Sequence, residues 1–72
     1  RVNSVNPTVT LTPMAAEAWA DPAKSAAALR NIPMGRFAEV EEVVAPVLFL
    51  LSGGASMVSG VALPVDGGYT IV

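Results

Sequence analysis

The sequence predicts an α/β fold in which a strand, two short helices, a long helix and a second strand follow one another. Three observations support this order: a valine-containing segment at residues 2–6, an apolar stripe at helical spacing over residues 40–51, and a short apolar run at residues 61–65. A strand, a helix and a second strand in this order are typical of one crossover unit of a parallel sheet.

The first strand is expected at residues 2–6, where Val2 and Val5 precede the Asn6-Pro7 turn signal. Residues 7–13 form a loop bounded by Pro7 and Pro13, because each proline fixes its own φ and biases the preceding residue away from the helix.

Two short helices follow the loop. Residues 14–19 are rich in alanine, which favours a helix. A second helix begins at Pro22, with Asp21 as its N-cap, and ends before Pro33. Residues 31–37 are expected to form a loop.

The strongest periodic signal predicts a helix over residues 40–51. Its apolar residues fall on one stripe: Val40, Val43, Val44, Val47, Leu48 and Leu51. Glu39, Glu41 and Glu42 gather at its start and are interpreted as a solvated first turn that complements the helix dipole. Pro46 removes one backbone hydrogen bond, so we expect a kink that leaves the carbonyl near Glu42 unsatisfied.

The remaining segments alternate between turns and one strand. Residues 52–54 predict a turn, and residues 55–60 an irregular segment or a single helical turn. Residues 61–65 predict a buried parallel strand, with Pro64 at a strand edge or end. A turn at residues 66–69 and an apolar tail at residues 70–72 complete the chain.

Composition excludes several kinds of site. The 72 residues are 53% apolar and 14% charged and contain neither cysteine nor histidine, which rules out disulfides, ordinary zinc sites and histidine-based catalysis. The net charge of −2 offers no basic surface for nucleic acid or an anionic membrane. A short chain this apolar is expected to be a fragment or subunit whose faces are covered by other protein.

No signal peptide is recognisable, and the longest apolar stretch, residues 43–51, is too short to span a bilayer. Membrane insertion is therefore not expected.

Taken alone, the ionisable residues do not form a convincing active site. Tyr69 has no nearby lysine to lower its pKa, and Lys24 is expected on an exposed, alanine-rich helix face. The 7–12 loop is more informative, because it follows the carboxyl end of a strand, where open α/β sheets bind ligands, and it carries threonine hydroxyls. It suits a nicotinamide carboxamide or a phosphate; the alternative is a plain connector bracketed by prolines.

Five ordered motifs cover essentially the whole chain, and together they resemble the C-terminal segment of a short-chain dehydrogenase/reductase. They are Arg1-Val2-Asn3-Ser4-Val5-Asn6-Pro7, the Pro-x-x-x-x-Thr loop ending at Thr12, Pro33-Met34-Gly35-Arg36, Phe49-Leu50-Leu51-Ser52 and Val65-Asp66-Gly67-Gly68-Tyr69. Within that family, the chain looks most like the dicarbonyl/L-xylulose reductase and tetrameric carbonyl reductase branch.

The resemblance implies that residues 1–72 are the C-terminal part of one Rossmann-type parallel sheet domain. Residues 1–13 would be a strand and a nicotinamide-side loop, residues 14–37 the substrate-lid helices, and residues 38–72 a long helix and the last strand. Pro7, Thr10 and Thr12 would bind the cofactor, Thr10 through its backbone and Thr12 through its hydroxyl. Thr10 stands where the family normally has valine or isoleucine, and Thr8 where glycine is common.

Trp19 would line the substrate site in the mobile lid; packing of its ring between the short helices is the other interpretation. The family's catalytic serine, tyrosine and lysine, and its glycine-rich phosphate loop, match no position in this chain. No metal ligand is expected.

The implied activity is hydride transfer between NADP(H), with NAD possible, and a carbonyl or sugar alcohol substrate. We expect the isolated chain to be inactive. Its partner within the subunit would be the remainder of the Rossmann domain. Four subunits would form a homotetramer through the 40–51 helix and the 61–65 strand, and the protein is expected in the cytoplasm. The alternative is a non-catalytic fragment that acts only as a structural or interaction piece.

Overall fold

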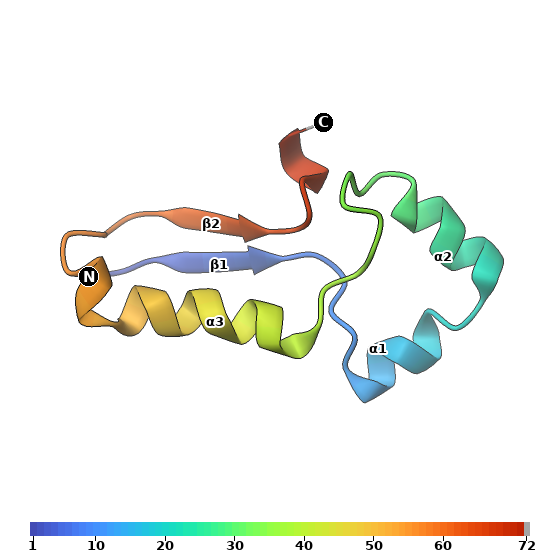
Figure 1. The fold of residues 1–72 in the computed structure, drawn as a ribbon, viewed down its shortest axis with the longest axis horizontal. Helices are drawn as coiled ribbons and strands as arrows, with labels where there is room; N and C mark the ends of the chain where they lie inside the picture. The colour runs from blue at the N-terminus through green and yellow to red at the C-terminus, as the bar shows by residue number, and fades with distance from the viewer. Residues whose placement is uncertain (72) are drawn as a thin grey trace.

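The computed structural model describes residues 1–71 and has the predicted α/β architecture. Two strands, β1 (Ser4–Pro7) and β2 (Ala62–Val65), run parallel, and one long helix, α3 (Val40–Leu51), lies along them (Figure 1). Two short helices, α1 (Pro13–Ala18) and α2 (Pro22–Leu29), lie beyond the carboxyl ends of both strands. This order and the parallel pairing confirm the fold class expected from the sequence.

The strand boundaries differ slightly from expectation. The register runs from Ser4 opposite Ala62 to Pro7 opposite Val65, so Pro7 ends β1 instead of opening the loop. A proline can end a strand because it needs no N–H there, and the Thr8 N–H continues the ladder to the Val65 carbonyl at 3.2 Å. Pro64 lies within β2, an edge strand of the two-stranded sheet that the structure describes.

Hydrogen bonds join the residues before β1 to the segment before β2. The Asn3 side chain donates to the Val58 carbonyl at 3.0 Å and accepts from the Val61 N–H at 2.9 Å. The Gly60 N–H donates to the Val2 carbonyl at 2.7 Å. Asn3 therefore fixes where the two strands begin, a role that sequence reasoning missed.

The short helices begin at predicted caps. Asp21 accepts from the Ala23 N–H at 3.0 Å, and Pro22 is the first residue of α2, as expected. α1 begins one residue earlier than predicted, at Pro13, and Trp19 is its C-cap. The loop expected at residues 7–13 is shorter than predicted, because Pro7 belongs to β1 and Pro13 to α1.

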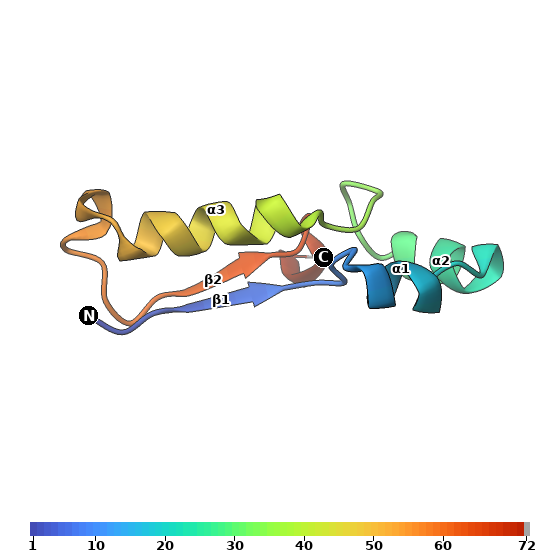
Figure 2. The same ribbon diagram turned by 90° about the horizontal axis from the view of Figure 1, so that it is seen from below.

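α3 has the predicted bounds and contains Pro46. Its ribbon shows no sharp bend in either view, so the kink expected at Pro46 is not seen (Figures 1 and 2). Proline removes the single hydrogen bond to the Glu42 carbonyl, and the other bonds of the helix preserve its direction.

After α3 the chain makes a short 3₁₀ turn at Gly53–Ala55, where an ordinary turn was expected, and a second one at Tyr69–Ile71 follows β2. Val72, the last residue of the predicted tail 70–72, lies outside the described residues.

Much apolar surface is left uncovered. In the described part of the chain the buried apolar side chains are Ile32, Phe37, Leu50 and Ala55. By contrast, Leu51 is 74% and Leu48 61% exposed, although both belong to the apolar stripe of α3. α3 covers one face of the strand pair, and no described helix covers the other face (Figure 2). Among residues 1–71, no helix combines the length and apolar character needed to cross a membrane.

Candidate functional site

The 7–12 loop lies at the carboxyl ends of β1 and β2, as predicted. Beyond Thr8 the chain leaves β2 and pairs instead with Ala38, the second residue before α3. The Ala38 N–H donates to the Val9 carbonyl at 3.0 Å, and the Leu11 N–H donates to the Ala38 carbonyl at 2.8 Å. This parallel bridge joins the loop to the segment that leads into α3.

Thr10 stands opposite Ala38 in the bridge, so its own N–H and carbonyl point away from Ala38. Within residues 1–71 its N–H has no hydrogen-bond acceptor. Its carbonyl accepts from the Thr12 N–H at 2.8 Å and keeps a second lone pair, and its hydroxyl donates to the Thr8 carbonyl at 3.1 Å. Thr10 therefore offers one backbone donor and one acceptor to an external amide group.

Thr12 caps α1 with its side chain. Its Oγ1 accepts from the Ala15 N–H at 3.1 Å, and its extended backbone (φ −72°, ψ 164°) is typical of an N-cap. Because the oxygen is the acceptor in that bond, the hydroxyl proton remains available for donation. Thr12 follows Thr10 by two residues, so both donors belong to one short stretch of chain.

Pro7 sets the place where the loop leaves the sheet, as the last residue of β1. Thr8 needs no unusual backbone conformation: every positive φ among the described residues belongs to a glycine. The roles of Pro7, Thr10 and Thr12 in cofactor binding stay predictions, with a geometry that suits them.

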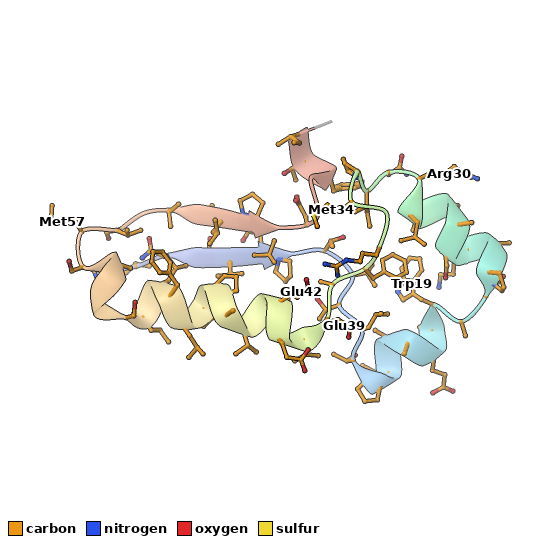
Figure 3. The ribbon with its side chains drawn as sticks, viewed as in Figure 1. Trp19, Arg30, Met34, Glu39, Glu42 and Met57 are labelled. Atoms are coloured by element: carbon orange, nitrogen blue, oxygen red, sulfur yellow. The ribbon has the colours of Figure 1, made fainter. Side chains whose placement is uncertain are left out.

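Trp19 packs between the short helices and the segment before α3 (Figure 3). Its ring is tilted against buried Phe37 with 5.2 Å between centroids, and the Lys24 ammonium lies 4.6 Å from the ring centroid. The Ser25 hydroxyl donates to the Trp19 carbonyl. The ring is only partly buried, so it is held by packing and retains an exposed area; its contact with substrate stays a prediction.

An ion pair at the start of α3 was missed by the sequence interpretation. Arg36 binds Glu42 with both terminal nitrogens, at 2.6 and 2.7 Å, and Glu42 Oε1 also accepts from the Glu39 N–H at 2.9 Å. The Arg36 hydrogen bond, then the Glu39 N–H, lower the pKa of Glu42 to about 2, and Glu42 raises the pKa of Arg36. Glu39 and Glu41 are exposed, as the expected solvated first turn requires, whereas Glu42 lies in the same turn but is only partly exposed and is bound to Arg36.

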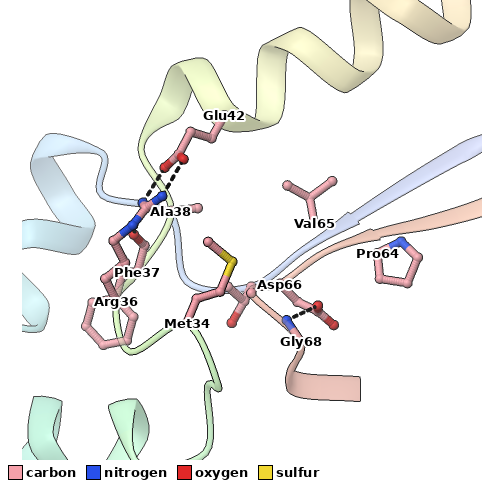
Figure 4. Close-up of a pocket in the computed structure, with 11 residues that line it drawn as sticks. Met34, Arg36, Phe37, Ala38, Glu42, Pro64, Val65, Asp66 and Gly68 are labelled. Carbon is pink, nitrogen blue, oxygen red and sulfur yellow. Dashed lines mark hydrogen bonds and ion pairs between the residues drawn. The ribbon is translucent and has the colours of Figure 1, made fainter. Parts of the chain in front are cut away.

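The Arg36–Glu42 pair lies beside a cavity of about 270 Å³ between the start of α3 and the end of β2 (Figure 4). Asp66 lies on the opposite side, only 9% exposed, and its carboxylate accepts three hydrogen bonds within a turn. It accepts from the Thr70 hydroxyl at 2.8 Å, the Thr70 N–H at 3.2 Å and the Gly68 N–H at 3.0 Å. These bonds, the Thr70 hydroxyl first, lower the pKa of Asp66, which therefore serves as a turn residue.

The turn that Asp66 holds packs closely against the loop after α2. Gly67 has a φ of +62°, and a Cβ there would lie 2.8 Å from Ile32 Cγ2. The Met34 N–H donates to the Gly67 carbonyl at 3.0 Å. Gly68 has a φ of +95°, and a Cβ there would lie 3.0 Å from Pro33 Cγ. Only glycine fits these conformations and these close approaches, which explains the paired glycines in the predicted turn at residues 66–69.

Metal ligands are not grouped in the part of the chain that the structure describes: no three of its aspartate and glutamate carboxylates lie close enough together to hold an ion.

Comparison with known proteins identifies close relatives. Residues 1–70 match the family model described as enoyl-(acyl carrier protein) reductase. The chain is 61% identical over 69 residues to L-xylulose reductase of Bos taurus, covering 96% of this chain and 28% of that protein. It is 54% identical over 71 residues to D-erythrulose reductase of Gallus gallus, covering 99% of this chain and 29% of that protein.

Solved structures of similar proteins also match this chain. A candidate 2-deoxy-D-gluconate 3-dehydrogenase from Agrobacterium tumefaciens, with bound NADP, superposes with a TM-score of 0.92 at 37% identity. The match covers 100% of this chain and 29% of that one. The chain thus spans less than a third of the length of each of these three proteins.

Proposed function

Because this chain belongs to the short-chain dehydrogenase/reductase family, we propose that it forms the nicotinamide-side loop, the substrate lid and part of the subunit interface of an NADP(H)-dependent reductase. The reaction of the whole enzyme is reversible hydride transfer between the cofactor and a carbonyl or sugar alcohol substrate. The bovine L-xylulose reductase and the chicken D-erythrulose reductase support this substrate class.

One observation carries the cofactor assignment: the Thr10 N–H has no acceptor within residues 1–71 and lies two residues from a hydroxyl able to donate. A carboxamide has one carbonyl and one NH₂, which match the Thr10 N–H and carbonyl. The bound cofactor supplies the hydride, and this chain binds and orients its nicotinamide end. NADP in the Agrobacterium structure favours NADP(H), and NAD is the alternative.

The lid role falls to α1 and α2, with Trp19 as a substrate-binding residue. α1 begins directly after the 7–12 loop and α2 follows it; both helices begin at capped positions, and neither contains a buried residue. The exposed part of the Trp19 ring would form an apolar wall for the substrate.

The interface role falls to α3 and β2. Exposed apolar side chains gather on α3 and beside β2: Val40, Val44, Val47, Leu48, Phe49, Leu51 and Val61. Monomers seldom leave such a large apolar surface uncovered. We propose that the remainder of the Rossmann domain covers part of it and that a homotetramer covers the rest.

The chain supplies binding and positioning groups but no catalytic residue. Tyr69, its single tyrosine, lies in the 3₁₀ turn after β2, and the one lysine of the sequence, Lys24, lies on α2. We expect the isolated chain to show no turnover.

A second candidate is a non-catalytic structural piece that associates through α3 without binding cofactor. The exposed apolar face of α3 favours it as well, because that face needs a partner in either case. The two candidates differ in whether the 7–12 loop meets a cofactor.

The test is a chimera in which this chain replaces the matching segment of bovine L-xylulose reductase. We expect the chimera to bind NADPH and to reduce L-xylulose, and the isolated chain to do neither. A folded chimera, shown by cooperative melting, that fails to bind NADPH would reject the cofactor role and favour the structural piece. Turnover by the isolated chain would show that the catalytic groups lie within it.

A further inference from the structure

The two backbone groups that flank Ala38 are both bound by the Arg36–Glu42 pair. On one side, Arg36 Nη1 donates to the Phe37 carbonyl at 3.4 Å. On the other side, the Glu39 N–H donates to Glu42 Oε1 at 2.9 Å. The same two side chains are joined by two charged hydrogen bonds at 2.6 and 2.7 Å. The ion pair therefore holds the backbone on both sides of Ala38.

Ala38 is the residue that orients the 7–12 loop. Its N–H and carbonyl bind Val9 and Leu11, and that pairing turns the Thr10 N–H away from the bridge. If Ala38 rotates or shifts, both bonds weaken and Thr10 loses its direction. A small misplacement of such a group is costly where a ligand must be held in one orientation.

We propose that Arg36 and Glu42 are positioning residues for the cofactor: they hold Ala38 so that the Thr10 N–H and carbonyl face the nicotinamide carboxamide. The inference rests on the proposed function. Neither side chain touches the cofactor in this role, and each acts through the backbone of residues 37–39.

A purely stabilising surface ion pair would behave differently. The Arg36 and Glu42 side chains are 52% and 40% exposed, and exposed pairs contribute little to stability. The pair nevertheless has two parallel bonds and a further backbone contact from each partner, which is more order than a simple surface contact requires. Its removal should therefore affect orientation of the loop more than melting.

The test uses two variants of the chimera, each with a matched control. Arg36→Met removes the guanidinium but leaves Glu42 able to accept from the Glu39 N–H; Arg30→Met, at an exposed arginine outside the site, is its control. Glu42→Gln keeps an acceptor for the Glu39 N–H but loses the charge; Glu41→Gln makes the same charge change one residue away.

Two ligands separate positioning from general damage. NADPH carries the nicotinamide, whereas adenosine bisphosphate is the half of the cofactor without it. We expect Arg36→Met and Glu42→Gln to weaken NADPH binding about tenfold and to change adenosine bisphosphate binding less than about twofold. In the unliganded chimera, amide hydrogen exchange at Leu11 and Ala38 should quicken in both variants and stay unchanged in both controls.

Each other outcome has a definite meaning. Equal weakening of both ligands, or unchanged NADPH binding and unchanged exchange at Leu11 and Ala38, would overturn the positioning role. An unsubstituted chimera that melts cooperatively but does not bind NADPH would instead reject the proposed function; exchange at Leu11 and Ala38 would still report whether the ion pair holds the bridge.

Discussion

The Thr12 hydroxyl accepts a hydrogen bond from the Ala15 N–H at 3.1 Å, so the residue expected to face the cofactor also begins α1. The oxygen serves the helix, and the proton is left for a ligand. The proposed cofactor contact and the start of α1 therefore depend on the same side chain.

Substitutions at Thr12 should separate these two roles. Thr12→Asp keeps a good N-cap but has no proton to donate and adds a negative charge, so we expect melting to change little and NADPH binding to weaken by about tenfold or more. Thr12→Val loses both the cap and the donor, and should also destabilise the protein by about 1 kcal/mol. The measurements are thermal melting and NADPH titration of the chimera.

Thr12→Ser is the control for the Thr12→Asp and Thr12→Val variants, because it keeps the hydroxyl. NADPH binding close to that of the parent is expected. If Thr12→Asp binds NADPH as well as Thr12→Ser does, the hydroxyl proton makes no contact with the cofactor.

Gly67→Ala should destabilise the turn after β2. The new Cβ would lie 2.8 Å from Ile32 Cγ2 at a φ of +62°. Strain and overpacking together should cost about 2–4 kcal/mol. Gly53→Ala, where a Cβ would meet nothing within 4 Å and φ is ordinary, is the control and should change stability far less. Similar melting temperatures for both variants would contradict the close approach of the turn to Ile32.

The Glu42 carboxyl should titrate far below its usual range. Its pKa is lowered from 4.5 to about 2, so it favours the folded state above about pH 4.5, and that contribution is lost as pH falls from 4.5 toward 2. Asp66, whose pKa is also lowered, acts in the same direction. Carboxyl carbon chemical shifts, followed by NMR in the chimera, measure the midpoint.

In the Arg36→Met variant the Glu42 midpoint should rise toward 4.5 but stay below it, because the Glu39 N–H still donates to the carboxylate. An unchanged midpoint would show that Arg36 does not bind Glu42 in solution.

Local patterns were enough to predict the elements, because each depends on residues close together in the chain. The apolar stripe of Val40 to Leu51 gave α3 its bounds, and Asp21-Pro22 gave the start of α2. The prediction of a kink at Pro46 was wrong, because it considered the hydrogen bond that proline removes but not the remaining hydrogen bonds of α3. The strand bounds in the structure differ from the predicted ones by one or two residues, because pairing between the strands determines where each strand begins and ends.

Contacts between distant residues were not predictable in this way. Asn3 binds Val58 and Val61, and Thr10 faces Ala38, only because two parallel strands bring those segments together. Arg36 and Glu42 are six residues apart across a helix start, a spacing with no fixed geometry before the cap is formed. The 7–12 loop was predicted as a candidate site from its place after a strand, whereas the direction of Thr10 required the Ala38 bridge.

Substitution of Trp19 should show whether its ring contacts the substrate or only packs against neighbouring residues. Trp19→Phe keeps an aromatic ring against Phe37, whose ring centroid lies 5.2 Å from that of Trp19. The smaller phenyl ring leaves less exposed aromatic surface for the substrate. We expect the KM of the chimera for L-xylulose to rise about fivefold, with NADPH binding and melting nearly unchanged, because the loss falls on substrate contact alone. Lys24→Met, which removes the ammonium from the ring while leaving Trp19 in place, should leave this KM near the parent value. A lower melting temperature for Trp19→Phe at an unchanged KM would assign Trp19 to packing.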